Sequence, residues 1–324
     1  MDIKELVVYV TSKCNLDCSF CYLSHRVRHE NPMMLSKKQL SWVRKNINPK
    51  KVFLMGGEPL LYPYLRTVLQ LFNNVTIASN GVLIEENIDV LRRYGVSVQL
   101  SIEGGREETD RTRGAGMWDR VLDAARLCRE NDVSVFLRSG LWRGNLKKLD
   151  ELFEVGRRLD VQVVLFPRID KPPLSFEEQV FVFDKALEND AVVGVPNFFQ
   201  YIGKRQGRCG AGSERVCVLY DGRVTPCQMD FDFVLGRVGD NIESVEKMRD
   251  VFVKHFKQTP LECIGCDRSS VCKGGCYVSK YYTGCPLRRK IDIGHLSMHS
   301  GFDIHNVESK GDALVDFMRD VIVC

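Results

Sequence analysis

The chain has 324 residues, 44% of them hydrophobic and 27% charged, which is ordinary for a globular protein of one large domain or two unequal ones. Its net charge of +4 is mild for this length, so the composition does not require nucleic acid or an acidic membrane as a partner. The apolar run at 6–10 is too short for a signal peptide or a membrane span, so we expect a cytoplasmic protein.

Six apolar strands alternate with amphipathic helices over residues 1–170, which we expect to form the first domain. The strands are expected at 5–10, 52–55, 75–78, 96–102, 133–138 and 161–166. The helices are expected at 36–47, from the end of the second strand to about 72, and at 85–94, 117–130 and 146–159. This alternation predicts a parallel sheet with right-handed crossovers, whose functional side chains lie at the carboxyl ends of the strands.

Three further segments follow the first domain. Residues 171–205 are expected to connect it to a cysteine-rich region at 206–290, and 291–324 to form a tail. In the connection, Ser175 and Glu178 form a capping box that predicts a helix to about 188. In the cysteine-rich region, Asp221-Gly222 predicts the turn of a hairpin. The tail contains His295 and His299, which we interpret as surface residues, and a short terminal helix is expected at 312–323.

The chain contains 13 cysteines, many for a cytoplasmic protein. In a reducing compartment, cysteines grouped at short spacings indicate metal ligands rather than disulfides. Cys128 and Cys324 stand apart from the groups. Cys128 lies in an apolar helical pattern and is expected in the core, and we assign no role to Cys324.

The first group is Cys14, Cys18 and Cys21, at C-x3-C-x2-C spacing directly after the first strand. Three thiolates can hold three irons of a 4Fe–4S cluster and leave the fourth iron open to bind a substrate. A zinc knuckle or three unrelated core cysteines are the alternatives. The loop, with Tyr22 after its last cysteine, resembles the cluster-binding signature of radical SAM enzymes, and the six strand–helix units match their partial (β/α)6 barrel. The resemblance implies that the open iron binds S-adenosylmethionine (SAM), which is cleaved to a 5′-deoxyadenosyl radical.

A second motif, Gly56-Gly57-Glu58, follows the second strand. Glycines let a ligand approach the backbone closely, and a carboxylate accepts hydrogen bonds from an ammonium group. A simple turn before a helix is the alternative. The motif resembles the Gly-Gly-Glu sequence with which radical SAM enzymes hold the amino group of SAM. By their position at the ends of the third to sixth strands, further SAM contacts are expected from Asn80, Ser101 and Arg138, and from Leu165-Phe166 near the adenine.

The second group of cysteines is large enough for two fully ligated clusters. Its eight members are Cys209, Cys217, Cys227, Cys263, Cys266, Cys272, Cys276 and Cys285. Their spacing, with Gly222 ahead of Cys227, resembles the SPASM domain, a small cysteine-rich α+β extension of radical SAM enzymes that modify peptides. The resemblance implies one auxiliary cluster on Cys209, Cys217, Cys227 and Cys276, and another on Cys263, Cys266, Cys272 and Cys285. A pair of structural zinc sites is the alternative.

Together these resemblances cover residues 5–285 and imply an enzyme with three 4Fe–4S clusters. It would abstract a hydrogen atom from a peptide or protein side chain, leading to an oxidised residue, a thioether or a carbon–carbon cross-link. Asp230 is a candidate proton acceptor for such an oxidation. The expected electron donor is ferredoxin or flavodoxin. Because only thirteen residues precede Cys14, we expect the peptide to need either a separate leader-binding protein or direct recognition in the barrel. Modification of a tetrapyrrole or another small molecule is the alternative activity, and a zinc-stabilised binding protein is the alternative outside the enzymes.

Overall fold

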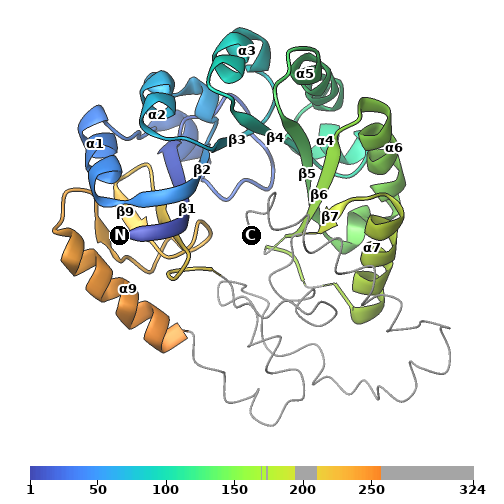
Figure 1. The fold of residues 1–324 in the computed structure, drawn as a ribbon. Coiled ribbons are helices and arrows are strands. Elements are labelled where there is room, and N and C mark those ends of the chain that lie inside the picture. The colour runs from blue at the N-terminus through green and yellow to red at the C-terminus, as the bar shows by residue number, and fades with distance from the viewer. Residues whose placement is uncertain (169, 173, 194–209, 257–324) are drawn as a thin grey trace, which may run out of the picture.

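The structure, a computed structural model, describes residues 1–168, 170–172, 174–193 and 210–256. Within these residues, ten strands form one sheet in the order β10-β9-β8-β1-β2-β3-β4-β5-β6-β7. The sheet curves into an open barrel, and the helices cover its outer face (Figure 1).

The first six strands confirm the predicted parallel sheet. They are β1 (Asp2–Thr11), β2 (Asn48–Gly56), β3 (Val75–Ser79), β4 (Ser97–Ile102), β5 (Val135–Leu141) and β6 (Gln162–Pro167). Each pairs in parallel with the next in chain order. A short seventh strand, β7 (Val192–Val193), pairs with β6 and was not predicted, because two residues carry no periodicity.

The helices on the outside of the sheet agree largely with the predicted ones. They are α1 (Lys37–Asn46), α2 (Leu65–Leu71), α3 (Ile84–Arg93), α5 (Met117–Glu130), α6 (Leu149–Leu159) and α7 (Phe176–Glu188). Capping boxes at Ser36 and Ser175 begin α1 and α7, the second as predicted. Two short 3-10 turns, η2 (Pro59–Leu61) and η3 (Arg143–Lys148), replace the first residues of the helices expected before 72 and from 146.

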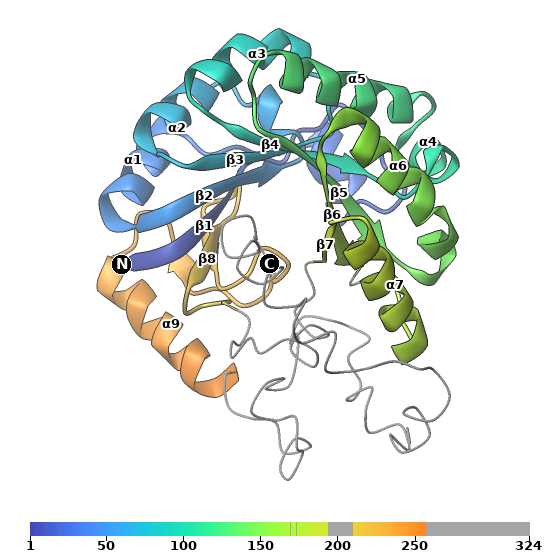
Figure 2. The same ribbon diagram turned by 45° about the vertical axis from the view of Figure 1, so that its right-hand side comes forward.

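Among the residues that the structure describes, three helices were not predicted: η1 (Arg26–Glu30), a π-helical turn, α4 (Arg106–Arg113) and α9 (Ile242–Phe256). The sequence of α4 contains no apolar residue, so it has no stripe that periodicity detects. Figure 2 shows α9 beside β8 and the N-terminus. The ammonium group of Met1 lies 3.5 Å from Oε1 of Glu246 on this helix.

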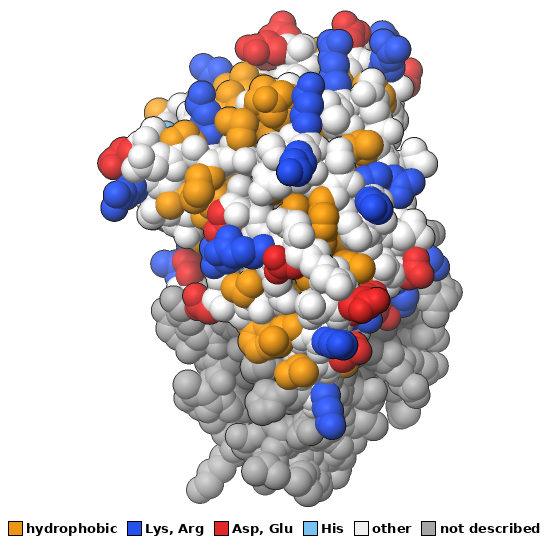
Figure 3. All heavy atoms as spheres, turned by 90° about the vertical axis from the view of Figure 1, so that its left-hand side faces the viewer, with side chains coloured by type: hydrophobic (Ala, Val, Ile, Leu, Met, Phe, Trp, Pro, Cys, Tyr) orange, Lys and Arg blue, Asp and Glu red, His pale blue; other side chains and the backbone are white. Residues whose placement is uncertain are grey.

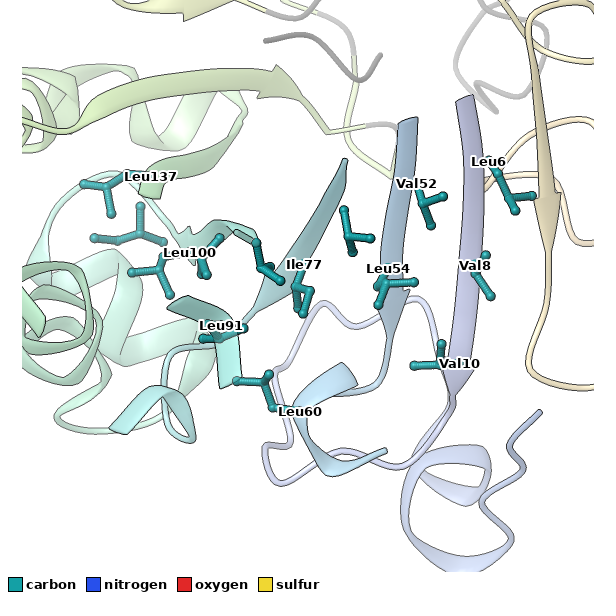
Figure 4. Packing of buried hydrophobic residues seen from close by; sticks show 14 of the residues in the cluster. Leu6, Val8, Val10, Val52, Leu54, Leu60, Ile77, Leu91, Leu100 and Leu137 are labelled. Carbon is teal, nitrogen blue, oxygen red and sulfur yellow. The ribbon is translucent and has the colours of Figure 1, made fainter. Parts of the chain in front are cut away.

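Strand β1 is buried on both faces from Glu5 onward, as is typical of a strand in a parallel sheet covered by helices. On β1, Leu6, Val8 and Val10 belong to the main core under the helices, together with residues of β2 to β4 (Figure 4). Val7 and Tyr9 of the same strand belong to a second cluster on the inner face of the barrel. Val7 and Tyr9 therefore make the inner face of β1 apolar between Glu5 and Thr11.

The predicted hairpin is confirmed, but it extends the barrel sheet. Strand β8 (Arg215–Val218) pairs in parallel with β1 and antiparallel with β9 (Arg223–Thr225), and β10 (Gly236–Arg237) continues the edge. Gly222 in the turn has φ of +83°, a conformation that favours glycine. The expected domain boundary at 206 thus does not separate two sheets. Cys209, Cys263, Cys266, Cys272, Cys276, Cys285 and the expected terminal helix lie outside the described residues.

The surface agrees with the mild net charge. On the face in Figure 3, lysines and arginines alternate with acidic residues, and no area of a single sign stands out. Among the described residues, no helix is long and apolar enough to cross a membrane.

Candidate active site

The loop with Cys14, Cys18 and Cys21 leaves the carboxyl end of β1, and all three side chains are half-buried. Arg28 of η1, which is buried, holds this loop from one side. Its guanidinium donates hydrogen bonds to the carbonyl oxygens of Leu16 (2.8 Å) and Leu23 (2.9 Å) and to Oδ1 of Asp17 (2.6 Å). These partners lie on both sides of Cys18 and Cys21, so one side chain fixes the whole loop. Sequence reasoning missed Arg28, because no pattern marks a π-helical turn.

Gly56 and Gly57 hold the same loop from the other side. A Cβ atom on Gly57 would lie 2.3 Å from the carbonyl oxygens of Ser12 and Lys13, and one on Gly56 would lie 2.3 Å from that of Thr11. The amide of Gly57 donates to the carbonyl oxygen of Thr11 (2.9 Å). Contact with the backbone that enters the cysteine loop therefore requires both glycines, and their role in admitting a ligand stays a prediction.

Glu58 is buried where the loop meets the ends of β2 and β3. Its Oε1 accepts a hydrogen bond from the amide of Leu60 (3.1 Å), and its Oε2 accepts one from the amide of Asn80 (2.8 Å). Burial raises the pKa of the Glu58 carboxyl to about 7, although the two backbone donors act in the opposite direction. The carboxyl thus titrates near neutrality, and its contact with SAM stays a prediction.

The other expected SAM contacts fall into two places. The side chain of Asn80 donates to Oδ1 of Asn15 (2.7 Å) in the cysteine loop and accepts from the amide of Val82 (3.0 Å), so it fastens the loop. Ser101 and Arg138 are register partners on β4 and β5. Both lie inside the barrel, and Arg138 is close enough to Tyr22, which follows Cys21, for the two side chains to interact electrostatically.

Arg138 has the character of an anion-binding residue. Its guanidinium lies over the ring of Phe166, 4.5 Å from the centroid, and burial lowers its pKa. Within the described part of the chain, no hydrogen bond or ion pair neutralises it. Leu165, the other residue expected near the adenine, belongs to the main core under the helices, so only Phe166 of that pair faces the site.

A second polar cluster, which the sequence did not reveal, follows β4. Oε1 of buried Glu103 accepts from Arg113 (2.6 Å), while Oε2 of Glu103 and Nε of Arg113 are buried with no partner among the described residues. Arg113 and Arg168 lie over the ring of Phe20, 5.1 and 4.3 Å from its centroid. Buried polar atoms normally find partners, so these orphaned atoms fit a site that holds a polar ligand.

Two of the predicted auxiliary ligands, Cys217 and Cys227, lie in the described residues and are buried. Cys217 on β8 is the register partner of Val7 and faces the inside of the barrel with Tyr9. Burial, Tyr22 and these two cysteines raise the pKa of the Tyr9 phenol, which keeps it a hydrogen-bond donor. The carboxylate of Asp230 accepts hydrogen bonds from the amides of Asp232 (3.1 Å) and Phe233 (3.0 Å), so this side chain stabilises its own loop. Its role as a proton acceptor stays a prediction.

The three loop cysteines fit a cluster better than a single zinc ion. Thiolates around one zinc, with bonds of about 2.3 Å, lie roughly 3.8 Å apart. Among the described residues, the three ligand atoms found within 4.8 Å of one another belong to Asp17, His25 and His29, not to the cysteines. Burial raises the pKa of the Cys14 thiol to about 11, so it needs bound metal to become a thiolate.

Comparison with known proteins agrees with this geometry. Residues 8–155 match the family model of the Radical SAM superfamily. The mycofactocin maturase MftC of Mycobacterium tuberculosis is 28% identical over 316 residues, covering 86% of this chain and 79% of its own. The PqqA peptide cyclase of Gluconobacter oxydans is 25% identical over 317 residues, covering 84% and 85%. Native anSMEcpe, solved with AdoMet and a Cp18Cys peptide, has a similar fold, with a TM-score of 0.69 at 16% identity over 99% of this chain and 100% of its own.

Proposed function

Because residues 8–155 match the family model of the Radical SAM superfamily, we propose that this enzyme reductively cleaves SAM and uses the resulting 5′-deoxyadenosyl radical on a peptide or protein side chain. The observation that carries the proposal is the loop of Cys14, Cys18 and Cys21, held by Arg28 and Gly57 at the carboxyl end of a parallel barrel. A 4Fe–4S cluster on these cysteines supplies the electron for the cleavage.

The polar residues of the barrel supply the binding site for SAM in this proposal. Arg138 is a partly buried cation with no anionic partner in the described residues, which suits the carboxylate of SAM, and Ser101 beside it offers a hydroxyl group. Glu58 lies against the cysteine loop with a pKa near neutrality, which suits the ammonium group. The unpartnered oxygen of Glu103 provides one further acceptor.

A peptide is the substrate class that the relatives support best. Two relatives that match more than four fifths of this chain are named a maturase and a peptide cyclase. The abstracted hydrogen atom would come from a carbon of the peptide, and an oxidised residue, a thioether or a carbon–carbon cross-link would follow.

Two auxiliary 4Fe–4S clusters on the eight C-terminal cysteines complete the proposal. Cys217 and Cys227 are buried near one another, as two ligands of one cluster require. Ferredoxin or flavodoxin would reduce the clusters, and a separate leader-binding protein would deliver the peptide. These partners, and the demand for reduced thiols, fit a cytoplasmic enzyme.

Iron analysis after anaerobic reconstitution tests the proposal. Three clusters give about 12 irons per chain. Replacing Cys14, Cys18 and Cys21 together with Ala is expected to leave about 8 irons and to abolish the release of 5′-deoxyadenosine from SAM.

The matched control is Cys128→Ala, which removes a buried core cysteine from α5. It is expected to keep the full iron content and the cleavage of SAM. A folded protein that binds zinc but no iron, or a triple variant that still cleaves SAM, contradicts the proposed function.

A further inference from the structure

Three aromatic rings meet between the two cysteine regions. Tyr9 lies on β1, Tyr22 directly follows Cys21, and Phe231 lies four residues after Cys227. The ring centroids are 6.1 Å apart for Tyr9 and Tyr22, 5.9 Å for Tyr9 and Phe231, and 5.8 Å for Tyr22 and Phe231. Ring pairs at these separations attract one another beyond the burial of their area. Each ring therefore contacts the other two, although two of them belong to different loops.

A hydrogen bond strengthens the contact with the second loop. The hydroxyl of Tyr9 donates to the carbonyl oxygen of Gln228 (2.9 Å), the residue after Cys227. Tyr9 is fully buried on the rigid central strand, so it offers a fixed point to this loop. Tyr22, by contrast, is 46% exposed, and its position depends on its ring contacts and on a hydrogen bond between its hydroxyl group and that of Tyr9.

The loop after Cys227 is itself stiffened, so a contact at Phe231 reaches the cysteine. Arg223 donates to the carbonyl oxygen of Phe231 (2.6 Å), and Asp230 accepts the amides of Asp232 and Phe233. The amide of Asp230 in turn donates to the carbonyl oxygen of Cys227 (3.1 Å). A displacement of the ring of Phe231 is thus transmitted to the backbone of Cys227.

We propose that Tyr9, Tyr22 and Phe231 form an aromatic brace that fixes the loop after Cys227 against the loop of Cys14, Cys18 and Cys21. The brace rests on the proposed function in one respect: if both loops carry clusters, it sets the position of one iron–sulfur site relative to the other. Its three members are positioning residues, because none of them supplies a ligand.

Reciprocal loosening is the result expected of a brace. Amide hydrogen exchange is measured in two segments, 14–24 and 228–233. Tyr22→Leu is expected to speed exchange in 228–233, and Phe231→Leu to speed exchange in 14–24, each by roughly two- to tenfold, because each ring holds the opposite loop. Tyr9→Phe keeps the ring and loses the bond to Gln228, so 228–233 is expected to exchange roughly two- to tenfold faster.

The matched control is Tyr62→Phe. The hydroxyl of Tyr62, also buried, donates to the carbonyl oxygen of Leu35, and its ring contacts Tyr64 rather than the brace. This variant is expected to leave exchange in both segments unchanged. Circular dichroism checks that every variant is folded, and Tyr22→Phe and Tyr9→Phe remain as conservative changes if a leucine variant unfolds.

Spectroscopy on the reconstituted protein gives a second readout. In Phe231→Leu, electron paramagnetic resonance of the reduced protein is expected to show a changed magnetic interaction between clusters at unchanged iron content. If each leucine variant loosens only its own segment and this interaction is unchanged, the brace is wrong. A wild-type protein that fails to cleave SAM overturns the proposed function instead, whatever the exchange rates show.

Discussion

At the scale of single residues, the site depends on the side chains that hold the cysteine loop as well as on the cysteines themselves. Arg28, Asn80 and Glu58 each bond to this loop or to the backbone beside it. The cysteines and the Gly-Gly-Glu motif were predictable because their spacing is local. Arg28 and Glu103 were not, because their partners are chosen by the fold and leave no pattern in the sequence.

Glu58 gives the protein a predictable dependence on pH. The pKa of its carboxyl group is about 7 in the folded protein, compared with an ordinary value of 4.5. Between these two pH values the folded state therefore binds more protons than the unfolded state. The contribution of Glu58 to stability is therefore present below about pH 4.5 and is lost as the pH rises through 7. The shift corresponds to roughly 3 kcal/mol. In Glu58→Gln, the unfolding free energy is expected to lose this contribution to its decrease between pH 4.5 and 7.5. Urea unfolding of the metal-free protein measures it.

An exposed residue of α3 provides the control for this prediction. Glu85→Gln is expected to leave the dependence of the unfolding free energy on pH as in the wild type. If Glu58→Gln and Glu85→Gln give the same dependence, the buried carboxyl does not titrate in this range. An overall loss of stability in Glu58→Gln, from the unpaired amide of Leu60 or Asn80, would not by itself bear on the prediction, because only the slope is compared.

At the scale of elements, the site is built by the contact between the ends of β1 and β2. The backbone of Gly56 and Gly57 packs directly on residues 11–13, so the cysteine loop takes its direction from the neighbouring strand. The strands themselves were predictable because buried parallel strands are continuous apolar runs. Helix α9 also carried a usable signal, since Val245 and Phe252, two turns apart, are both buried, whereas wholly polar α4 carried none.

Gly57→Ala tests the contact between these strand ends. The added Cβ meets two backbone carbonyl oxygens at 2.3 Å, and backbone cannot move aside as a flexible side chain can. We expect a loss of about 1–3 kcal/mol in unfolding free energy. We also expect about four fewer irons per chain after reconstitution, because the cysteine loop is displaced.

Gly105→Ala, at the end of β4, is the matched control. Its Cβ would meet Oε2 of Glu151 at 2.1 Å, the far end of a flexible side chain that can move away. This variant is expected to keep its full iron content. Equal iron loss in both variants would show that the contact at Gly57 is not what orders the loop.

At the scale of the whole molecule, the C-terminal hairpin belongs to the barrel. Strand β8 pairs with β1, the strand that leads into the cysteine loop, and so brings Cys217 beside Val7. The sequence predicted the hairpin from its turn but not its place in the sheet. Pairing between residues some 210 positions apart leaves no trace in local periodicity.

The ion pair of Glu5 and Arg215 fastens this junction. Nε and one terminal nitrogen of Arg215 donate to the two carboxylate oxygens of Glu5, at 3.1 and 3.0 Å, and both side chains are buried. Removing one partner leaves a buried charge uncompensated, whereas replacing both with apolar residues can be nearly neutral.

We therefore expect Arg215→Met alone to lower the unfolding free energy by about 3–5 kcal/mol, and Glu5→Leu with Arg215→Met to recover most of this loss. Urea unfolding of the two variants and of Glu5→Leu alone closes the double-mutant cycle. The exposed pair of Lys4 and Glu214, which joins the same two segments, is the control, and Lys4→Met is expected to cost less than about 1 kcal/mol. If Arg215→Met costs no more than Lys4→Met, the buried pair does not hold the hairpin to the barrel. The backbone pairing of β1 with β8 and the apolar contacts around Cys217 must then be sufficient.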